Sequence, residues 1–185
     1  FDLERLDYVN SLYIRKLSAT DLAEKSLPFL CKKDLITVAH NALHTQSGRE
    51  VSRELLARVV GLEQERMKHL DEVGESTRFF FLEDVSFSAE DLICKKSDKT
   101  KTQEALFDVY KLLEALEEKD FTQQNLEKVL FEDIQQKGRG NGDVLWPLRM
   151  SLTGQKASPS PFECLEILGK HVSLARIQAA LSKLS

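Results

Sequence analysis

The sequence has few of the residues that break or cross-link a fold. Its 185 residues include only eight glycines, four prolines and three cysteines. Cys31, Cys94 and Cys164 are odd in number, lie far apart and form no Cys-x-x-Cys pair, which argues against both a disulfide framework and a zinc site. We therefore expect free, buried thiols.

Long apolar stretches and an excess of positive charge are also missing. No apolar run approaches the roughly 20 residues that a membrane span needs, and the first residues do not resemble a signal peptide. We therefore expect a soluble, cytoplasmic protein without a membrane partner. The net charge of −4 argues against a general polyanion-binding surface, and we expect no DNA binding.

The elements of a catalytic or metal site are absent as well. His40 and His44 are four residues apart, but Asn41 replaces the glutamate of a His-Glu-x-x-His site and no third ligand is evident. The glycine-rich stretch 138–142 follows a predicted helix and has no Gly-Lys-Ser/Thr, so it does not match a phosphate-binding loop. No nucleophile, base and orienting group can be placed together, and we predict neither catalysis nor a bound metal or cofactor.

The apolar residues that are present recur mainly at intervals of three and four, which favours helices. We predict an all-α protein made of two consecutive helical-bundle subdomains, residues 1–88 and 89–185. The boundary is placed at the polar residues around Ser86 and Ser88. Asp2, Ser18, Thr122 and Ser160 are the predicted N-caps of four of the helices.

Three apolar segments require a choice between helix and strand. Leu35, Ile36, Ala39 and Leu43 are interpreted as a helical stripe. A second stripe begins at Val51, continues past Gly61 to Leu70, and would place Arg66 on the same helix. The compact run Phe79–Leu82 is interpreted as helical core, although its periodicity alone decides nothing.

The most informative segment lies near the C-terminus. Leu145-Trp146-Pro147-Leu148-Arg149 leads to a Thr153-Gly154 turn, and Ser158-Pro159-Ser160-Pro161 follows. Ser160 and Glu163 predict a capping box, with Pro161 at the first helical position and Gly169 ending that helix. The prolines restrict the backbone around them, so polar groups are expected to converge near the guanidinium of Arg149.

The order and spacing of these residues resemble the anticodon-binding end of bacterial-type glutamyl-tRNA synthetases, which are class I aminoacyl-tRNA synthetases. The resemblance extends to the start of the chain, where 1–7 and 10–15 look like the segment that leads out of the family's stem-contact region. It also includes Glu65–Glu72 and is strongest at 145–170. It implies helical subdomains of the anticodon-binding type. It also implies that Arg66 and Arg149 contact anticodon bases, with further contacts from Ser158 and Pro159.

This chain departs from the family in the same loop. The family usually continues with Gly and Leu where this chain has Ser160 and Pro161, which puts the last backbone contact and the apolar contact with a base in question. We retain both residues in the predicted anticodon site. Between 137 and 156 there are four basic residues and one acidic residue, and Lys137, Arg139 and Lys156 are the candidates for phosphate contacts.

Two signatures of the family's catalytic part are missing, since neither a His-Ile-Gly-His-type nor a Lys-Met-Ser-Lys-Ser-type string occurs. The chain begins with Phe1, and we interpret it as an excised C-terminal piece. Catalysis, ATP and Mg²⁺ would then belong to the absent part. The expected partner is glutamate tRNA, with acceptance of glutamine tRNA left open, and the expected state is a monomer.

Competing interpretations remain at this point. A single arginine on a helical protein more often covers apolar surface with its stem than binds a ligand, and the capping box explains Ser160, Pro161 and Glu163 without RNA. Trp146 is more often a core residue than a platform for a base. The alternative function is a helical protein–protein interaction module whose amphipathic surfaces bind a partner helix.

Overall fold

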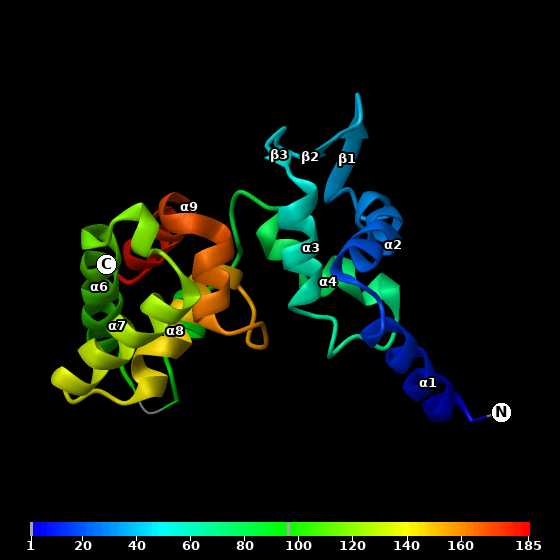
Figure 1. Cartoon of the computed structure of the whole chain (residues 1–185). Coiled ribbons are helices and arrows are strands. Elements are labelled where there is room, and N and C mark those ends of the chain that lie inside the picture. The colour runs from blue at the N-terminus through cyan, green and yellow to red at the C-terminus, as the bar shows by residue number, and fades with distance from the viewer. Residues whose placement is uncertain (1, 96) are drawn as a thin grey trace. The chain divides into compact units, whose positions relative to one another are not determined.

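The computed structural model describes residues 2–95 and 97–185 (Figure 1). The chain divides into two compact units, residues 1–83 and 84–185. The first contains α1 (Leu3–Arg15), α2 (Ala19–Lys32), β1 (Ile36–Ala39), β2 (Ala42–Thr45), β3 (Glu50–Val51), α3 (Arg53–Gly61), η1 (Leu70–Glu72), α4 (Val73–Ser76) and η2 (Arg78–Phe80). The second contains α5 (Ala89–Leu92), α6 (Lys99–Ala115), η3 (Glu118–Asp120), α7 (Gln123–Gln136), α8 (Asn141–Thr153) and α9 (Pro161–Lys183).

The predicted helix starts are confirmed at all four caps. The side chains of Asp2, Ser18, Thr122 and Ser160 accept hydrogen bonds from the backbone nitrogens of Arg5, Asp21, Asn125 and Glu163, respectively. Each bond satisfies an amide that has no partner within its own helix. These starts were predictable because capping is a local interaction.

The all-α prediction is wrong for residues 36–51, which form a three-stranded antiparallel sheet in the order β1-β2-β3. Ile36 pairs with Thr45, and Leu43 pairs with Val51. These four side chains are 1–2% exposed and face the interior. Leu35, Ile36, Ala39 and Leu43 therefore have the spacing of a helical stripe, although the segment forms a hairpin.

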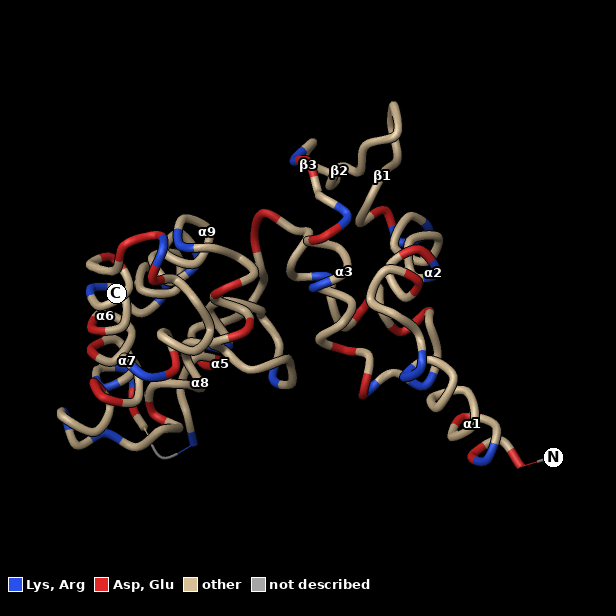
Figure 2. The backbone as a smooth tube through the Cα atoms, viewed as in Figure 1, with Lys and Arg blue, Asp and Glu red and all other residues tan. Residues whose placement is uncertain are grey.

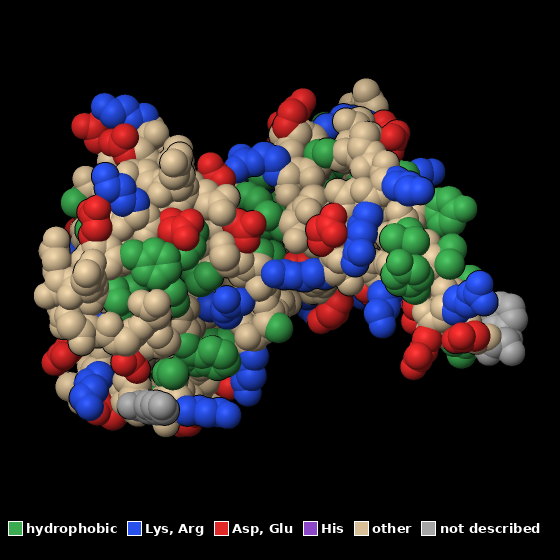
Figure 3. Space-filling view, turned by 60° about the horizontal axis from the view of Figure 1, so that its bottom comes forward, with side chains coloured by type: hydrophobic (Ala, Val, Ile, Leu, Met, Phe, Trp, Pro, Cys, Tyr) green, Lys and Arg blue, Asp and Glu red, His purple; other side chains and the backbone are tan. Residues whose placement is uncertain are grey.

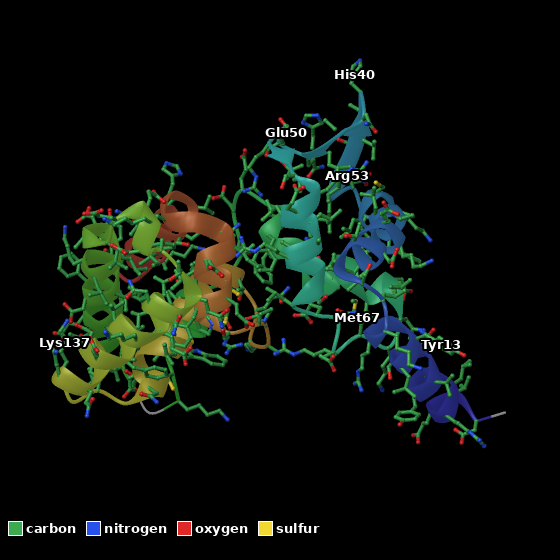
Figure 4. All side chains as sticks on the ribbon, viewed as in Figure 1. Tyr13, His40, Glu50, Arg53, Met67 and Lys137 are labelled. Carbon is green, nitrogen blue, oxygen red and sulfur yellow. The ribbon has the colours of Figure 1, made fainter. Side chains whose placement is uncertain are left out.

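The turn between β1 and β2 explains this result. His40 and Asn41 have φ values of 50° and 65°, so two successive left-handed residues reverse the chain between Ala39 and Ala42. Such a two-residue turn matches the twist of a hairpin, and the β-branched residues before it favour a strand. His40 lies at the tip of the hairpin (Figure 4), so the helical spacing assumed for His40 and His44 does not exist.

The second correction concerns the helix predicted to run from residue 51 to Leu70. α3 ends at Gly61, and the chain continues through a series of turns, here called the Arg66 loop (residues 62–69), before η1 begins at Leu70. Hydrogen bonds of the i→i−3 type, from Glu63 N to Val60 O at 3.2 Å and from Gln64 N to Gly61 O at 3.3 Å, replace the helical ladder. Arg66 therefore lies in a loop.

The core of the first unit forms where α2 packs on α3 and on the segment leading to η2. Phe79, Phe80 and Phe81 are 1–3% exposed, and the first two belong to the 3-10 turn η2, which confirms the interpretation of this run as helical core. Arg49 Nη2 donates to the carbonyl of Phe80 at 2.6 Å and ties the sheet to this core.

The second unit is entirely helical within its described residues. α6, α7, α8 and α9 pack around side chains that are 0–3% exposed: Leu106, Val109, Leu113, Leu126, Leu130, Ile134, Leu148, Leu152 and Leu165. Gly169, with φ 77° and ψ 166°, breaks α9 where the sequence predicted a helix end. No helix among the described residues is long and apolar enough to cross a membrane.

Candidate functional site

Arg149 lies in α8 between side chains that are buried in the second unit. Leu148 and Met150 are 0% and 2% exposed, whereas Arg149 is only half-buried. Its Nη1 donates to the carbonyl of Ser158 at 2.8 Å, to Ser158 Oγ at 3.1 Å and, at 3.4 Å, to the carbonyl of Pro159. The structure therefore brings together Arg149 and the Ser-Pro segment. We call residues 149 and 158–161 the Arg149 corner.

The chain reaches this corner through a tight turn at the end of α8. Gly154 has φ 66°, and its amide donates to the carbonyl of Met150 at 2.9 Å. Thr153 Oγ1 donates to the carbonyl of Arg149 at 2.8 Å and accepts from the amide of Gln155 at 3.0 Å. These bonds fix the direction in which the chain leaves α8.

The other side of the corner is the start of α9. Ser160 N donates to Glu163 Oε2 at 2.8 Å, and Glu163 N donates to Ser160 Oγ at 3.2 Å, which confirms the predicted capping box. Pro159 and Pro161 are buried, whereas Ser158 and Ser160 are partly exposed. The prolines therefore hold the corner from inside the unit, and the serines lie at its surface.

The hydrogen bonds of Arg149 determine which of its donors are free. Nη1 makes all three contacts with the corner, and no acceptor for Nε or Nη2 is found within residues 2–95 and 97–185. A guanidinium offers five N–H donors in one plane. The corner thus fixes one end of the fork and leaves the other donors for an external acceptor.

Trp146 lies one helical turn before Arg149. Its indole Nε1 donates to the carbonyl of Asp91 at 2.9 Å, and the ring is half-buried. Residues three apart in a helix lie on the same face, so the ring and the guanidinium are neighbours on α8. A tryptophan between apolar neighbours is expected in the core, whereas the i, i+3 spacing from Arg149 is the sequence signal for a position beside the corner.

Lys156 lies in the loop between Gly154 and the corner. Its side chain is 72% exposed, and Nζ is 3.4 Å from Asp91 Oδ1. Hydrogen bonds from Ser88, first from its backbone amide and then from its hydroxyl, lower the pKa of Asp91, and Lys156 adds to the effect. Such an exposed pair is weak in water.

Lys137 and Arg139, unlike Lys156, form close ion pairs with less exposed carboxylates. Lys137 Nζ is 3.0 Å from Asp108 and 2.8 Å from Asp133, and Arg139 Nη2 is 2.7 Å from Asp108. Figure 4 shows Lys137 at the end of α7, and Figure 2 shows acidic and basic residues interspersed on both units. The positive charges of Lys137 and Arg139 are therefore compensated by carboxylates of α6 and α7.

These ion pairs also affect proton affinity. Burial favours the neutral form of Asp108, but hydrogen bonds from Lys137 and Arg139 outweigh it and lower the pKa of this carboxyl. Burial likewise opposes the charge on Lys137, yet Asp133 and Asp108 raise the pKa of its ammonium group. The cluster links the end of α7 to α6, and both of its cations are paired with carboxylates.

Arg66 lies in the first unit, in the Arg66 loop. Its side chain is 57% exposed, and Nη1 is 3.3 Å from Oε1 of Glu63, whose own side chain is only 8% exposed. The guanidinium is thus accessible to solvent and attached at one end to a buried carboxylate. Among the described residues, no group of three or more His, Cys, Asp or Glu side chains has the arrangement of a metal site.

Comparisons with known proteins point to an anticodon-binding domain and to glutamate–tRNA ligases. The profile of a family described as "Anticodon binding domain" matches residues 21–181. The chain is 34% identical over all 185 residues to glutamate–tRNA ligases of Herpetosiphon aurantiacus and Dehalococcoides mccartyi, of which it covers 35% and 36%. It therefore spans about a third of the length of these curated relatives.

Solved structures show the same fold at lower identity. A glutamate tRNA ligase from Elizabethkingia meningosepticum, in complex with its amino acid, superposes with a TM-score of 0.78 at 22% identity over the whole of this chain and 33% of its own. A glutamate-tRNA synthetase from Elizabethkingia anophelis gives 0.70 at 21% identity, covering 98% of this chain and 32% of its own.

Proposed function

Because the chain belongs to the anticodon-binding domain family, we propose that it recognises the anticodon of glutamate tRNA and is itself non-catalytic. Glutamylation would be carried out by a catalytic region of the kind that the longer relatives contain, with ATP and Mg²⁺ bound there. The predicted subdomains, 1–88 and 89–185, would each contribute side chains.

The observation that carries this proposal is the geometry of the Arg149 corner. One end of the guanidinium is held by Ser158 and Pro159, and Nε and Nη2 are left for a ligand. Anticodon loops present unstacked bases whose edges carry paired acceptors, which a planar fork can bond. A base lacking those acceptors leaves buried donors unpaired, at a cost of roughly 1–3 kcal/mol per contact.

The other predicted residues take different parts in this proposal. Ser160 and Pro161 form the start of α9 that fixes the Ser-Pro segment, and the side chain of Ser160 is already used in capping. Arg66 is the accessible guanidinium of the first unit. Lys156 supplies the phosphate contact, because Lys137 and Arg139 are occupied by carboxylates.

Substitution of Arg149 tests the proposal. Arg149→Ala should weaken binding of unmodified glutamate tRNA roughly 5- to 150-fold, corresponding to the loss of one such contact. Arg149→Lys should lose most of the same affinity, because a lysine retains the charge but not the planar fork. Lys128→Ala removes an equal charge from an exposed position on α7 and should change binding by less than about twofold.

Gel-shift titration, with helicity checked by circular dichroism, measures these effects. If Arg149→Ala binds as tightly as the parent protein, the assignment of the corner is wrong. Parallel titration with glutamine tRNA determines whether both tRNAs are accepted.

One observation favours the alternative of a protein–protein interaction module. Leu3, Leu6 and Tyr13 of α1 are 66%, 47% and 68% exposed, which is unusual for large apolar side chains. These residues are in the first unit, whereas the corner is in the second. If tRNA displaces a protein partner bound by the chain, both functions involve the same surface. If tRNA never binds, the protein–protein interaction function is the one that is left.

A further inference from the structure

α1 has an unusual orientation in the first unit. Its large apolar side chains Leu3, Leu6, Val9 and Tyr13 are 40–68% exposed, and Figure 3 shows hydrophobic side chains at the surface of this end of the unit. The hydrogen bonds and ion pairs that α1 makes with the rest of the unit converge on the Arg66 loop.

Gln64 makes the central contact. Its side-chain amide donates to the carbonyls of Ile14 and Leu17, both at 2.9 Å, at the C-terminal end of α1. The last carbonyls of a helix have no partner within it, so one amide group completes the helix end and fixes the loop. Figure 4 shows Met67 of the same loop beside this end of α1, and Met67 is 2% exposed.

Contacts between three further residue pairs flank Arg66 on both sides. Before it, Arg15 of α1 donates from Nη2 to the carbonyl of Glu65 at 2.9 Å, and its Nε is 3.2 Å from Glu65 Oε2. After it, Asn10 donates to the carbonyl of Lys68. His69 Nε2 lies 3.1 Å from Asp7 Oδ1. The residues around Arg66 are thus attached to α1, whereas Arg66 itself contacts only Glu63 among the described residues.

We propose that α1 is a positioning element for Arg66, and that Gln64 is the residue through which it acts. Attachment of residues 64, 65, 68 and 69 to one rigid helix confines the backbone of residue 66, so its guanidinium is presented in one place. This inference rests on the proposed anticodon function. It adds that affinity at Arg66 depends on the helix to which its loop is attached.

Gln64→Met tests the inference, because methionine has nearly the same length, carries no charge and lacks the donor. It should weaken binding of glutamate tRNA about fivefold, a typical coupling for residues in one network. In an Arg66→Ala background the loss from Gln64→Met should fall below about twofold. In an Arg149→Ala background it should remain about fivefold, because Arg149 belongs to the other unit and is not one of the residues that attach the loop to α1.

Two matched pairs control for general effects. Gln46→Met removes an exposed amide from the same unit and should leave binding unchanged. Arg15→Gln should reproduce the effect of Gln64→Met, whereas Arg5→Gln removes the same charge from α1 at an exposed position and should not. The second pair also keeps the test decisive if Gln64→Met reduces helicity.

Hydrogen exchange provides a readout without RNA. Amides of residues 63–69 should exchange at least about tenfold faster in Gln64→Met than in Gln46→Met, since loss of the attachment permits local opening. Unchanged exchange, or equal losses of affinity with and without Arg66, would overturn the positioning role. Failure of the parent protein to bind tRNA would instead refute the proposed function, and the exchange data would still decide whether α1 holds the loop.

Discussion

Gly154 is where a single methyl group should have the largest effect on the Arg149 corner. Its φ of 66° is left-handed, and a Cβ at this position would lie 2.8 Å from the backbone oxygen of Ser86. Gly138 provides the matched comparison, because its φ is 61° and a Cβ there meets nothing within 4 Å. Both glycines have a left-handed φ, but only at Gly154 would an added Cβ meet a neighbouring atom.

The magnitude follows from adding these two costs. A left-handed alanine costs roughly 1 kcal/mol, so Gly138→Ala should lower the free energy of unfolding by about that amount. Overpacking against an atom that must move adds about 1–3 kcal/mol. Gly154→Ala should therefore destabilise the second unit by about 2–4 kcal/mol, or roughly 10 °C or more in Tm for a unit of about 100 residues.

Fluorescence of Trp146 measures this effect in the correct unit. It is the single tryptophan of the chain and lies in α8, the helix that Gly154 terminates. Urea unfolding followed at this residue should give midpoints in the order parent, Gly138→Ala, Gly154→Ala, with similar m-values. Equal midpoints for the two variants would refute the close approach of Gly154 to Ser86.

Three further changes test other parts of the structure. Ser160→Ala should cost about 1 kcal/mol of stability in the same urea assay, because it removes the N-cap of α9. Asp108→Asn should cost about 1–3 kcal/mol at pH 7, since it breaks the contacts with Lys137 and Arg139. The pKa of Asp108 is lowered in the fold, so this contribution is present above its unfolded pKa and is lost as the pH falls below 3.8; a difference that persists in acid would contradict the ion pairs. Lys156→Ala should reduce the slope of log affinity for tRNA against log salt by about 0.7–0.9, with little change in the preference between tRNAs.

Much of the corner was predictable because it depends on residues close together in the chain. The capping box of Ser160 and Glu163, the Gly154 turn and the break at Gly169 are each set by a few neighbouring residues. The hairpin at 36–45 was missed because His40 and Asn41 are left-handed without a glycine, and because four apolar residues happened to have helical spacing.

The phosphate candidates show what a count along the sequence leaves out. Lys137, Arg139 and Lys156 are equally basic in the sequence, but Asp108 comes from α6, nearly 30 residues earlier, and compensates two of them. Only the tertiary structure brings Asp108 of α6 close to the end of α7. The electrostatics of this segment therefore could not be obtained from local composition.

The amino-acid sequence alone determined the helix starts, the turn after α8 and the family resemblance, because each rests on interactions or spacings within a few residues. Tertiary structure decided the sheet, the end of α3 at Gly61 and the attachment of the Arg66 loop to α1. Those features depend on hydrogen bonds between residues far apart in the chain, such as Gln64 with Ile14 and Leu17, whose partners become neighbours only when the chain folds.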